Sequence, residues 1–409
     1  MQLIDTIKPR WVNGRWVFFG VVIGGLYGFT EPLVGGIDVR LSPLLRGGVV
    51  VDEGIRGMTI GPIENSSHMQ EGYGSPAFAR ALDELSAIGV SWIALTPFGR
   101  VADGSGGGID WTFEKPFEQN QQDIRRAIRM AHAHHLKVML VPHLWVESGE
   151  WRALINPKTE EKWKAWISSY RRFVLAWAAL AEESQVEMFS AGVELRSWVT
   201  TGWASYFIDL LHEIRSTYRG LVTYSANWDD VEQTSILGEL DVIGINAFYP
   251  LAEQEGADLH ALQQGAEQVH EQVRRLAEQW QRPVLFTELG YATRTDPAIK
   301  PWEWPEAMQR VTVDEQGQAD AYRAILAPLL EEPLFAGFFV WRVYSDPENA
   351  SEEPEWGFSP RGKLAEGVIR DAFVSLWACD QRRLKQWHVP VELPGIYPYP
   401  WPFEDIPSP

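Results

Sequence analysis

The sequence predicts a single (β/α)8 barrel, and two observations carry that prediction. Short apolar runs alternate with longer helix-like segments from about residue 57 to residue 378. The runs lack the in-and-out alternation of a half-solvated sheet, which is typical of parallel strands covered on both faces. Eight such units fit the length of a (β/α)8 barrel. A doubly wound open sheet is the competing fold, but residues 57–65 contain no glycine-rich phosphate loop.

The predicted strands are brief and apolar, and each is followed by a helical pattern or a polar loop. In chain order they are Met58–Gly61, Ser91–Thr96, Val138–Pro142, Met188–Gly192, Leu221–Ser225, Val242–Asn246, Val284–Thr287 and Gly337–Trp341.

The helices between them show start and stop signals. Ser75 and Pro76 supply an N-cap followed by proline at the first helical position, and Gly89 supplies a C-cap. From Leu259 to Trp280 the apolar residues recur three and four apart, which predicts one buried stripe on a surface helix. The remaining predicted helices are 121–135, 160–183, 203–218, 316–330 and 363–376.

Composition excludes several classes of partner. The chain has 36 basic and 55 acidic side chains, a formal charge of −19, which disfavours nucleic acid. Its one cysteine, Cys379, cannot form an internal disulfide. His132, His134 and His135 are predicted on a helix outside the barrel, and the acidic loop Asp346–Glu355 is most simply a solvated surface. The sequence predicts neither a metal nor a cofactor.

The two ends of the chain differ from the middle. Residues 1–56 are predicted as an N-terminal extension, in which Lys8, Arg10 and Arg15 precede an apolar run over residues 16–29. That pattern is typical of a signal-peptide core or a short membrane anchor and favours an exported or tethered barrel. A buried strand or hairpin in a cytoplasmic protein is the alternative. Residues 379–409, rich in proline and aromatic residues, are predicted as a C-terminal tail.

Two predicted strands end in a glutamate. Glu194 follows the fourth strand and Glu288 the seventh, on nearly opposite sides of the barrel mouth. A carboxylate at the end of an apolar strand costs free energy unless it has a partner or a function. Catalytic groups of such barrels lie at the carboxyl ends of the strands. Two facing glutamates are what the acid-catalysed cleavage of a glycosidic bond requires.

Other strand ends carry groups suited to sugars. Aromatic rings stack on the apolar faces of sugars, whereas histidine and asparagine orient hydroxyls. Each ring alone is better explained as core, but together they favour a carbohydrate cleft. The predicted substrate contacts are His143 and Trp145 after the third strand, Asn227 and Trp228 after the fifth, Phe248 and Tyr249 after the sixth, and Trp341 with Arg342 after the eighth.

Several motifs resemble glycoside hydrolase family 113, known for endo-β-1,4-mannanase activity, in the clan of retaining barrels with catalytic glutamates on strands four and seven. By this resemblance Glu194 is the acid/base and Glu288 the nucleophile. Tyr249 resembles the tyrosine that hydrogen-bonds the nucleophile, Trp341 resembles the ring under the reacting sugar, and Trp151 belongs to a substrate-contacting motif. The motifs, in family order, are GVSWIAL, VPHLW, SGEW, AGVEL, SANWDD, LDVIGINAFYPL, PVLFTELGY and GFSPRGK.

One residue departs from the family pattern. Val193 stands where the family commonly has threonine and much of the clan has asparagine. The resemblance therefore implies a retaining β-glycosidase, endo-acting on β-1,4-mannan or a related β-linked hexose polysaccharide, with the sugar left open. A β-glycanase of other specificity, a transglycosylase of envelope glycan assembly and a non-catalytic polysaccharide-binding barrel are the alternatives. Of the two carboxyls, the acid should have the higher pKa and the nucleophile Glu288 the lower one.

Overall fold

The computed structural model describes residues 10–12, 15–17, 54–61, 72–112, 115–304, 311–346 and 354–386, the last ten without side chains. The chain divides into two units, Met1–Val39 and Arg40–Pro409. In the first unit, β1 (Arg10–Val12) pairs antiparallel with β2 (Arg15–Val17). The apolar segment 16–29 otherwise lies outside the described residues. Within the described part of the chain, helices long and apolar enough to cross a membrane are absent.

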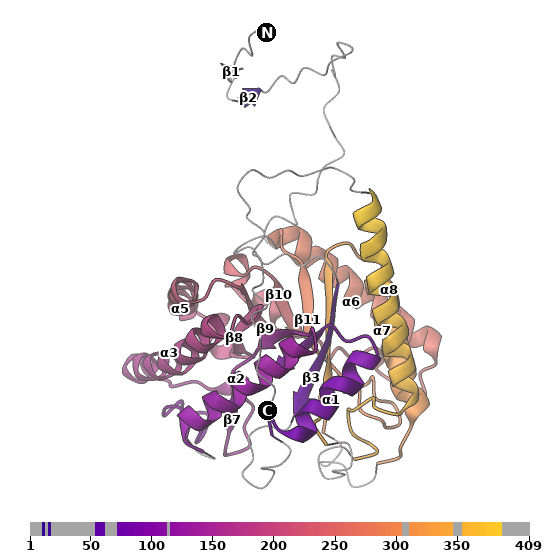
Figure 1. Cartoon of the computed structure of the whole chain (residues 1–409), viewed down its shortest axis with the longest axis horizontal. Coiled ribbons are helices and arrows are strands. Elements are labelled where there is room, and N and C mark those ends of the chain that lie inside the picture. Colours follow the sequence, from indigo (N-terminus) through magenta and orange to yellow (C-terminus); the bar gives the residue numbers. More distant parts are fainter. Residues whose placement is uncertain are drawn as a thin grey trace, which may run out of the picture. The chain divides into compact units, whose positions relative to one another are not determined.

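The second unit is a (β/α)8 barrel, as predicted (Figure 1). Eight parallel strands close on themselves in chain order, so that each strand pairs with the next and the last with the first. They are β3 (Ile55–Gly61), β4 (Trp92–Leu95), β6 (Lys137–Leu140), β8 (Met188–Val193), β9 (Leu221–Asn227), β10 (Ile243–Asn246), β11 (Val284–Leu289) and β12 (Phe335–Tyr344). All eight overlap the predicted runs.

Side chains alternate between two cores along the strands. On β4, Trp92 and Ala94 point into the barrel with Met139 and Phe339, whereas Ile93 and Leu95 pack outwards against the helices. This two-residue period explains why both faces are apolar and why no solvated face appears in the sequence. Gly57 is required by the inner packing, because a Cβ there would lie 2.3 Å from the ring of Phe339.

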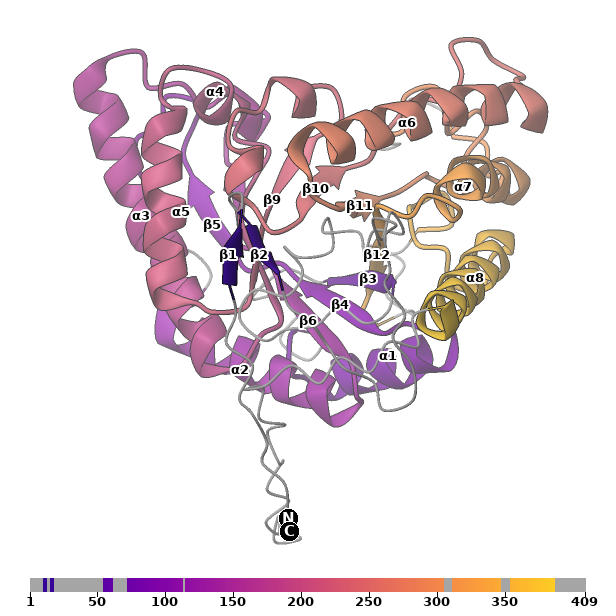
Figure 2. The ribbon, with the colours of Figure 1, turned by 90° about the horizontal axis from the view of Figure 1, so that it is seen from above.

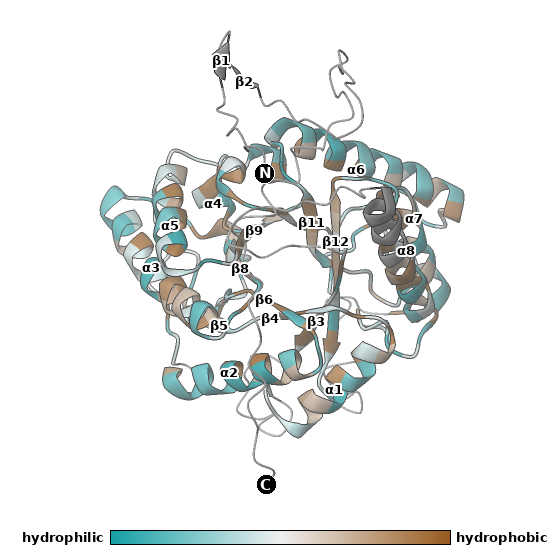
Figure 3. Cartoon of the chain, turned by 45° about the horizontal axis from the view of Figure 1, so that its top comes forward, coloured by the Kyte–Doolittle hydropathy of each residue, from teal (hydrophilic) through white to brown (hydrophobic). Residues whose placement is uncertain are grey.

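The helices form a ring outside the strands (Figure 2). Ser75 caps the first helix as predicted, by accepting a hydrogen bond from the amide of Phe78. Figure 3 shows the outer surfaces of α2 and α6 as largely hydrophilic. The helices are α1 (Pro76–Ala87), α2 (Phe117–Ala133), α3 (Glu160–Glu183), the short α4 (Arg196–Val199), α5 (Ala204–Thr217), α6 (Leu259–Trp280), α7 (Glu315–Leu329) and α8 (Leu364–Gln386).

The short connection between β9 and β10, where no helix was predicted, forms two 3₁₀ turns, Val231–Gln233 and Leu237–Glu239. Two details differ from the sequence prediction. The last helix, α8, continues to Gln386, beyond the helix end predicted at residue 376. Two extra strands, β5 (Phe98–Val101) and β7 (His143–Val146), pair in parallel beyond the ends of β4 and β6. The small sheet that they form extends the barrel wall at the end where the carboxylates were predicted.

Candidate active site

Glu194 lies directly after β8 and is held by three donors. Its carboxylate Oε2 accepts hydrogen bonds from Trp151 Nε1 and from Arg152 Nη1, both at 2.7 Å. Oε1 accepts from Asn246 Nδ2 at 3.0 Å. The residue is 7% exposed and has a φ of 51°, in the left-handed region that non-glycine residues avoid. Such local backbone strain is characteristic of functional positions.

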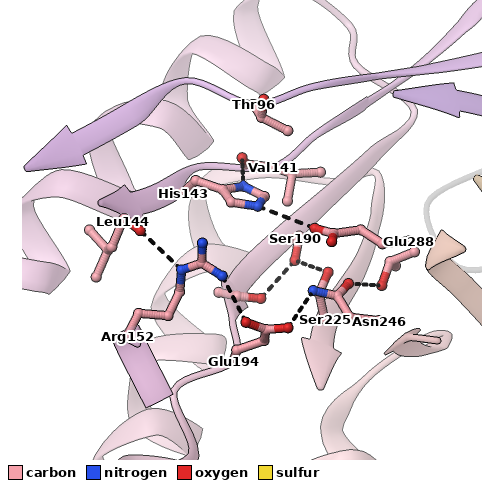
Figure 4. Close-up of polar contacts among 12 residues, drawn as sticks. Thr96, Val141, His143, Leu144, Arg152, Ser190, Glu194, Ser225, Asn246 and Glu288 are labelled. Atoms are coloured by element: carbon pink, nitrogen blue, oxygen red, sulfur yellow. Dashed lines mark hydrogen bonds and ion pairs between the residues drawn. The ribbon is translucent and has the colours of Figure 1, made fainter. Parts of the chain in front are cut away.

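Glu288 lies near the end of β11 and has a different environment. It is also 7% exposed, and its Oε1 lies 3.3 Å from His143 Nε2 (Figure 4). His143 Nδ1 lies 3.0 Å from the carbonyl oxygen of Val141, so Nδ1 carries the proton of a neutral ring. Nε2 is then an acceptor, and the contact with Glu288 is a hydrogen bond only when the Glu288 carboxyl is protonated and donates.

The pKa values of Glu288 and His143 are consistent with a protonated Glu288 and a neutral His143. Burial, reinforced by the negative charge of Glu194, raises the pKa of Glu288 from 4.5 to about 8, and Arg152 and Arg342 only partly oppose this. Burial and, to a smaller extent, Arg152 lower the pKa of His143 from 6.5 to about 3. Without ligand at neutral pH, Glu288 is thus mostly protonated and His143 neutral. The expectation of a low pKa at Glu288 fails, because burial raises the pKa of this carboxyl and the negative charge of Glu194 adds to the effect.

The aromatic residues are distributed unequally around the two glutamates. Trp341 is 8% exposed and stacks on His143, with ring centroids 6.2 Å apart. Trp151 donates a hydrogen bond to Glu194. Trp145 on β7 is 46% exposed. Trp228 stacks on Trp302 at 5.4 Å and packs in one cluster with Trp341. The structure therefore brings five of the predicted contacts to the same end of the barrel as both glutamates: His143, Trp145, Trp151, Trp228 and Trp341.

Two of the predicted substrate contacts, Asn227 and Tyr249, do not have the partners that were expected. Asn227 donates its amide to Asp229 Oδ1 at 2.6 Å rather than to either glutamate. The hydroxyl of Tyr249 is buried without a hydrogen-bond partner in the described part of the chain, so the expected bond to Glu288 is not formed. The ring of Phe248 packs with Trp341 instead. Side chains alternate along an extended chain, so Phe248 shares the side of Asn246, which reaches Glu194, and Tyr249 faces away.

Two residues of the site were missed by sequence reasoning. Arg152 follows Trp151 in the chain, and Asn246 was treated only as the end of a strand. Asn246 is oriented by Thr287, whose hydroxyl donates to Asn246 Oδ1 at 3.0 Å and leaves the amide N–H for Glu194. A polar residue at the end of an apolar strand is the signal that could have identified Asn246.

The histidines away from the site have ordinary ion-pair partners. His132 lies 3.3 Å from Glu187, and His134 lies 3.0 Å from Asp83. Among the described residues, three or more potential metal ligands do not gather anywhere. Most of the acidic loop Asp346–Glu355 lies outside the described residues.

The raised pKa of Glu288 predicts how stability depends on pH. Between pH 4.5 and about 8 the folded protein holds a proton that the unfolded chain has lost. The free energy of unfolding therefore decreases as pH rises through this window, with a slope of up to about 1.4 kcal/mol per pH unit from this group. Glu288→Gln should flatten this slope and make the variant more stable than the wild type at pH 7.5. Urea unfolding at several pH values measures it. Parallel stability curves for the two proteins would contradict the assignment.

Comparison with known proteins identifies the family to which this chain is similar. The model of Glycoside Hydrolase Family 113 matches residues 65–363. A GH113 β-mannanase from Alicyclobacillus acidocaldarius is 26% identical, with a TM-score of 0.67 over 79% of this chain and 98% of that one. A GH113 β-1,4-mannanase is 23% identical, with a TM-score of 0.66 over 79% and 99%. A family 5 mannosidase from Rhizomucor miehei is 11% identical, with a TM-score of 0.60 over 81% and 95%. Curated protein sequences gave no match.

Proposed function

Because the chain belongs to glycoside hydrolase family 113, we propose that it cleaves β-1,4-mannan or a related β-linked hexose polysaccharide with retention of anomeric configuration. The observation that carries this proposal is the pair Glu194 and Glu288. Both carboxyls are buried at the carboxyl end of the barrel; Glu194 accepts hydrogen bonds from Trp151, Arg152 and Asn246, and Glu288 contacts His143.

In the first step, the Glu288 carboxylate attacks the anomeric carbon while Glu194 donates its proton to the departing glycosidic oxygen. A covalent glycosyl-enzyme results. In the second step, Glu194, now a carboxylate, takes a proton from water as the water oxygen attacks the anomeric carbon. The bond from the anomeric carbon to Glu288 breaks as the water oxygen bonds to that carbon, which releases Glu288 as a carboxylate and the sugar with its original configuration.

The reaction requires Glu288 as a carboxylate, whereas burial and the negative charge of Glu194 raise the pKa of Glu288 to about 8. We infer that substrate binding shifts the proton to Glu194. A sugar placed between the carboxyls would displace Arg152 from Oε2, and Glu288 would become the ion that the developing positive charge on the sugar favours.

The proposed substrate class is supported by the similar solved structures and by the aromatic residues beside the two glutamates. Two of the similar solved structures are described as β-mannanases of the same family. Trp145, 46% exposed, offers a flat apolar surface of the kind on which a hexose stacks, and Trp341, 8% exposed, stacks on His143 beside Glu288. Val193, 2% exposed, packs in the inner barrel core, so it offers the sugar no polar contact.

Product analysis tests the proposal. Purified protein is incubated with β-1,4-linked mannotriose to mannohexaose and with the matching glucose oligosaccharides. Mass spectrometry identifies the products, and proton NMR gives the anomer formed before mutarotation. We expect the mannose series to be cleaved to shorter oligosaccharides whose first-formed reducing ends are β. First-formed α anomers would exclude retention, and cleavage of the glucose series alone would exclude the mannan assignment.

A further inference from the structure

Arg342 is a buried cation at the end of the barrel that holds the two glutamates. It follows Trp341 on β12 and is 8% exposed. Its guanidinium carbon lies 4.8 Å from the ring centroid of Trp341, 4.6 Å from that of Tyr344 and 5.7 Å from that of Trp304. Nη2 also donates a hydrogen bond to the Tyr344 hydroxyl. The three rings recover part of the cost of burying the charge.

Arg342 differs from the other arginines near the barrel mouth, because those have carboxylate partners. Arg100 pairs with Glu147 at 3.2 Å, Arg152 with Glu194 at 2.7 Å and Arg196 with Asp230 at 2.6 Å. Among the described residues no carboxylate lies within ion-pair distance of Arg342, and its Nε is buried without a hydrogen-bond partner. A buried guanidinium is usually paired or hydrogen-bonded. Its donors therefore remain available for an acceptor that the described residues do not supply.

Arg342 lies close enough to the two central groups to affect both. Its positive charge acts to lower the pKa values of Glu288 and of His143. Its guanidinium lies over Trp341, the ring that stacks on His143. Trp304, whose ring centroid lies 5.7 Å from the guanidinium carbon, is 42% exposed, so a rotation of that side chain would open Arg342 to a ligand. A sugar next to Trp341 would present its substituents to this cation.

We propose that Arg342 binds a carboxylate on the sugar at the reacting position, so that the preferred substrate is a β-linked polysaccharide containing uronic acid residues. A guanidinium recognises a carboxylate through paired N–H donors, with a strength that neutral hydroxyls do not match. The overall charge of −19 disfavours long-range attraction of any polyanion, including this one. Because surface charges are screened beyond about 8 Å at physiological salt, binding would depend on the short-range contact with the guanidinium. The inference rests on the proposed function, since it names the substrate of the same site.

The test uses full-length Glu288→Gln protein, in which ligands bind without turnover. Calorimetry at pH 6.5 and physiological salt compares β-1,4-linked mannotriose with the corresponding trimannuronate. We expect the acidic trisaccharide to bind about tenfold more tightly or better. Adding Arg342→Gln should remove this advantage while leaving mannotriose affinity within about twofold. Equal or tighter binding of mannotriose by the Glu288→Gln protein overturns the proposal before any Arg342 variant is needed.

A second variant of Arg342 and a sulfated ligand complete the test. If Arg342→Gln fails to fold by circular dichroism, Arg342→Lys keeps the charge without the planar fork and should retain a reduced preference. An unchanged preference overturns the proposal. A 6-sulfated mannotriose that binds as tightly as trimannuronate overturns the carboxylate assignment.

Wild-type turnover separates this inference from the proposed function. If wild-type protein hydrolyses mannotriose but the Glu288→Gln protein shows no acidic preference, this inference fails and the proposed function stands. If the acidic ligand is preferred but wild type hydrolyses neither trisaccharide, the proposed function fails instead.

Discussion

Replacing Glu288 with glutamine is expected to abolish turnover of every glycoside substrate, with a loss in kcat on the order of 10⁴–10⁶-fold. The amide cannot form the glycosyl-enzyme, and a reactive leaving group does not help because the missing group is the proposed nucleophile. The neutral amide replaces a carboxyl that is itself mostly protonated in the ligand-free protein, so the fold is preserved. Release of reducing sugar and of nitrophenol from aryl glycosides measures the loss.

Glu332 offers a matched control for this variant. Like Glu288 it is a buried glutamate beside a histidine, with Oε2 3.2 Å from His270 Nε2. It precedes β12 and so lies at the opposite end of the strands. Glu332→Gln should therefore retain activity. Turnover by Glu288→Gln protein above a tenth of the wild-type rate would remove Glu288 from the nucleophile role.

The second large effect is expected at Glu194, and it depends on the leaving group. Glu194→Gln should lower kcat/KM on oligosaccharides by about 10²–10⁴-fold, because the departing sugar oxygen needs the proton. On dinitrophenyl glycosides the first step should be nearly unaffected, since that leaving group departs as an anion. The glycosyl-enzyme should then accumulate, because water lacks its general base, and a burst of dinitrophenol should precede a slow steady rate.

Azide supplies the control for this assignment. A small anionic nucleophile needs no base, so azide should restore the steady rate of Glu194→Gln protein on the activated substrate and yield a β-glycosyl azide. The same addition should not rescue Glu288→Gln protein in this way, because no β-linked product can form there by double displacement. An equal loss on all leaving groups in Glu194→Gln protein would contradict its role as acid.

The barrel and its two glutamates could be predicted because both leave local signals. Each strand is a short apolar run, since both of its faces are buried. Glu194 and Glu288 are conspicuous because a charge at the end of such a run is costly. The extra strands β5 and β7 are only four residues each and follow the barrel strands almost directly, so they read as continuations or loops.

The remaining parts of the site depend on contacts across long stretches of chain. Arg152 meets Glu194 across 42 residues and Asn246 meets it across 52, and neither pairing has a local pattern. The choice between Phe248 and Tyr249 depends on which way the chain turns after β10, whose pairing with β11 shifts register between Ile245 and Asn246. The family resemblance favoured the tyrosine, but backbone direction places the phenylalanine at the site. The raised pKa of Glu288 likewise depends on burial and on the nearby charge of Glu194, which only the folded chain brings about.

The small β5–β7 sheet has a consequence for the thermodynamics of binding. Trp145 is held on a strand in register with Arg100, whose guanidinium lies 5.7 Å from its ring centroid and pairs with Glu147. The strand therefore fixes the backbone of Trp145, and the guanidinium favours one position of its ring before any sugar arrives. Ordering a mobile side chain on association costs about 0.5–1.5 kcal/mol, and this platform avoids that penalty. A sugar should thus dock there with little entropy loss on the protein side, at a rate set by diffusion and orientation rather than by loop closure.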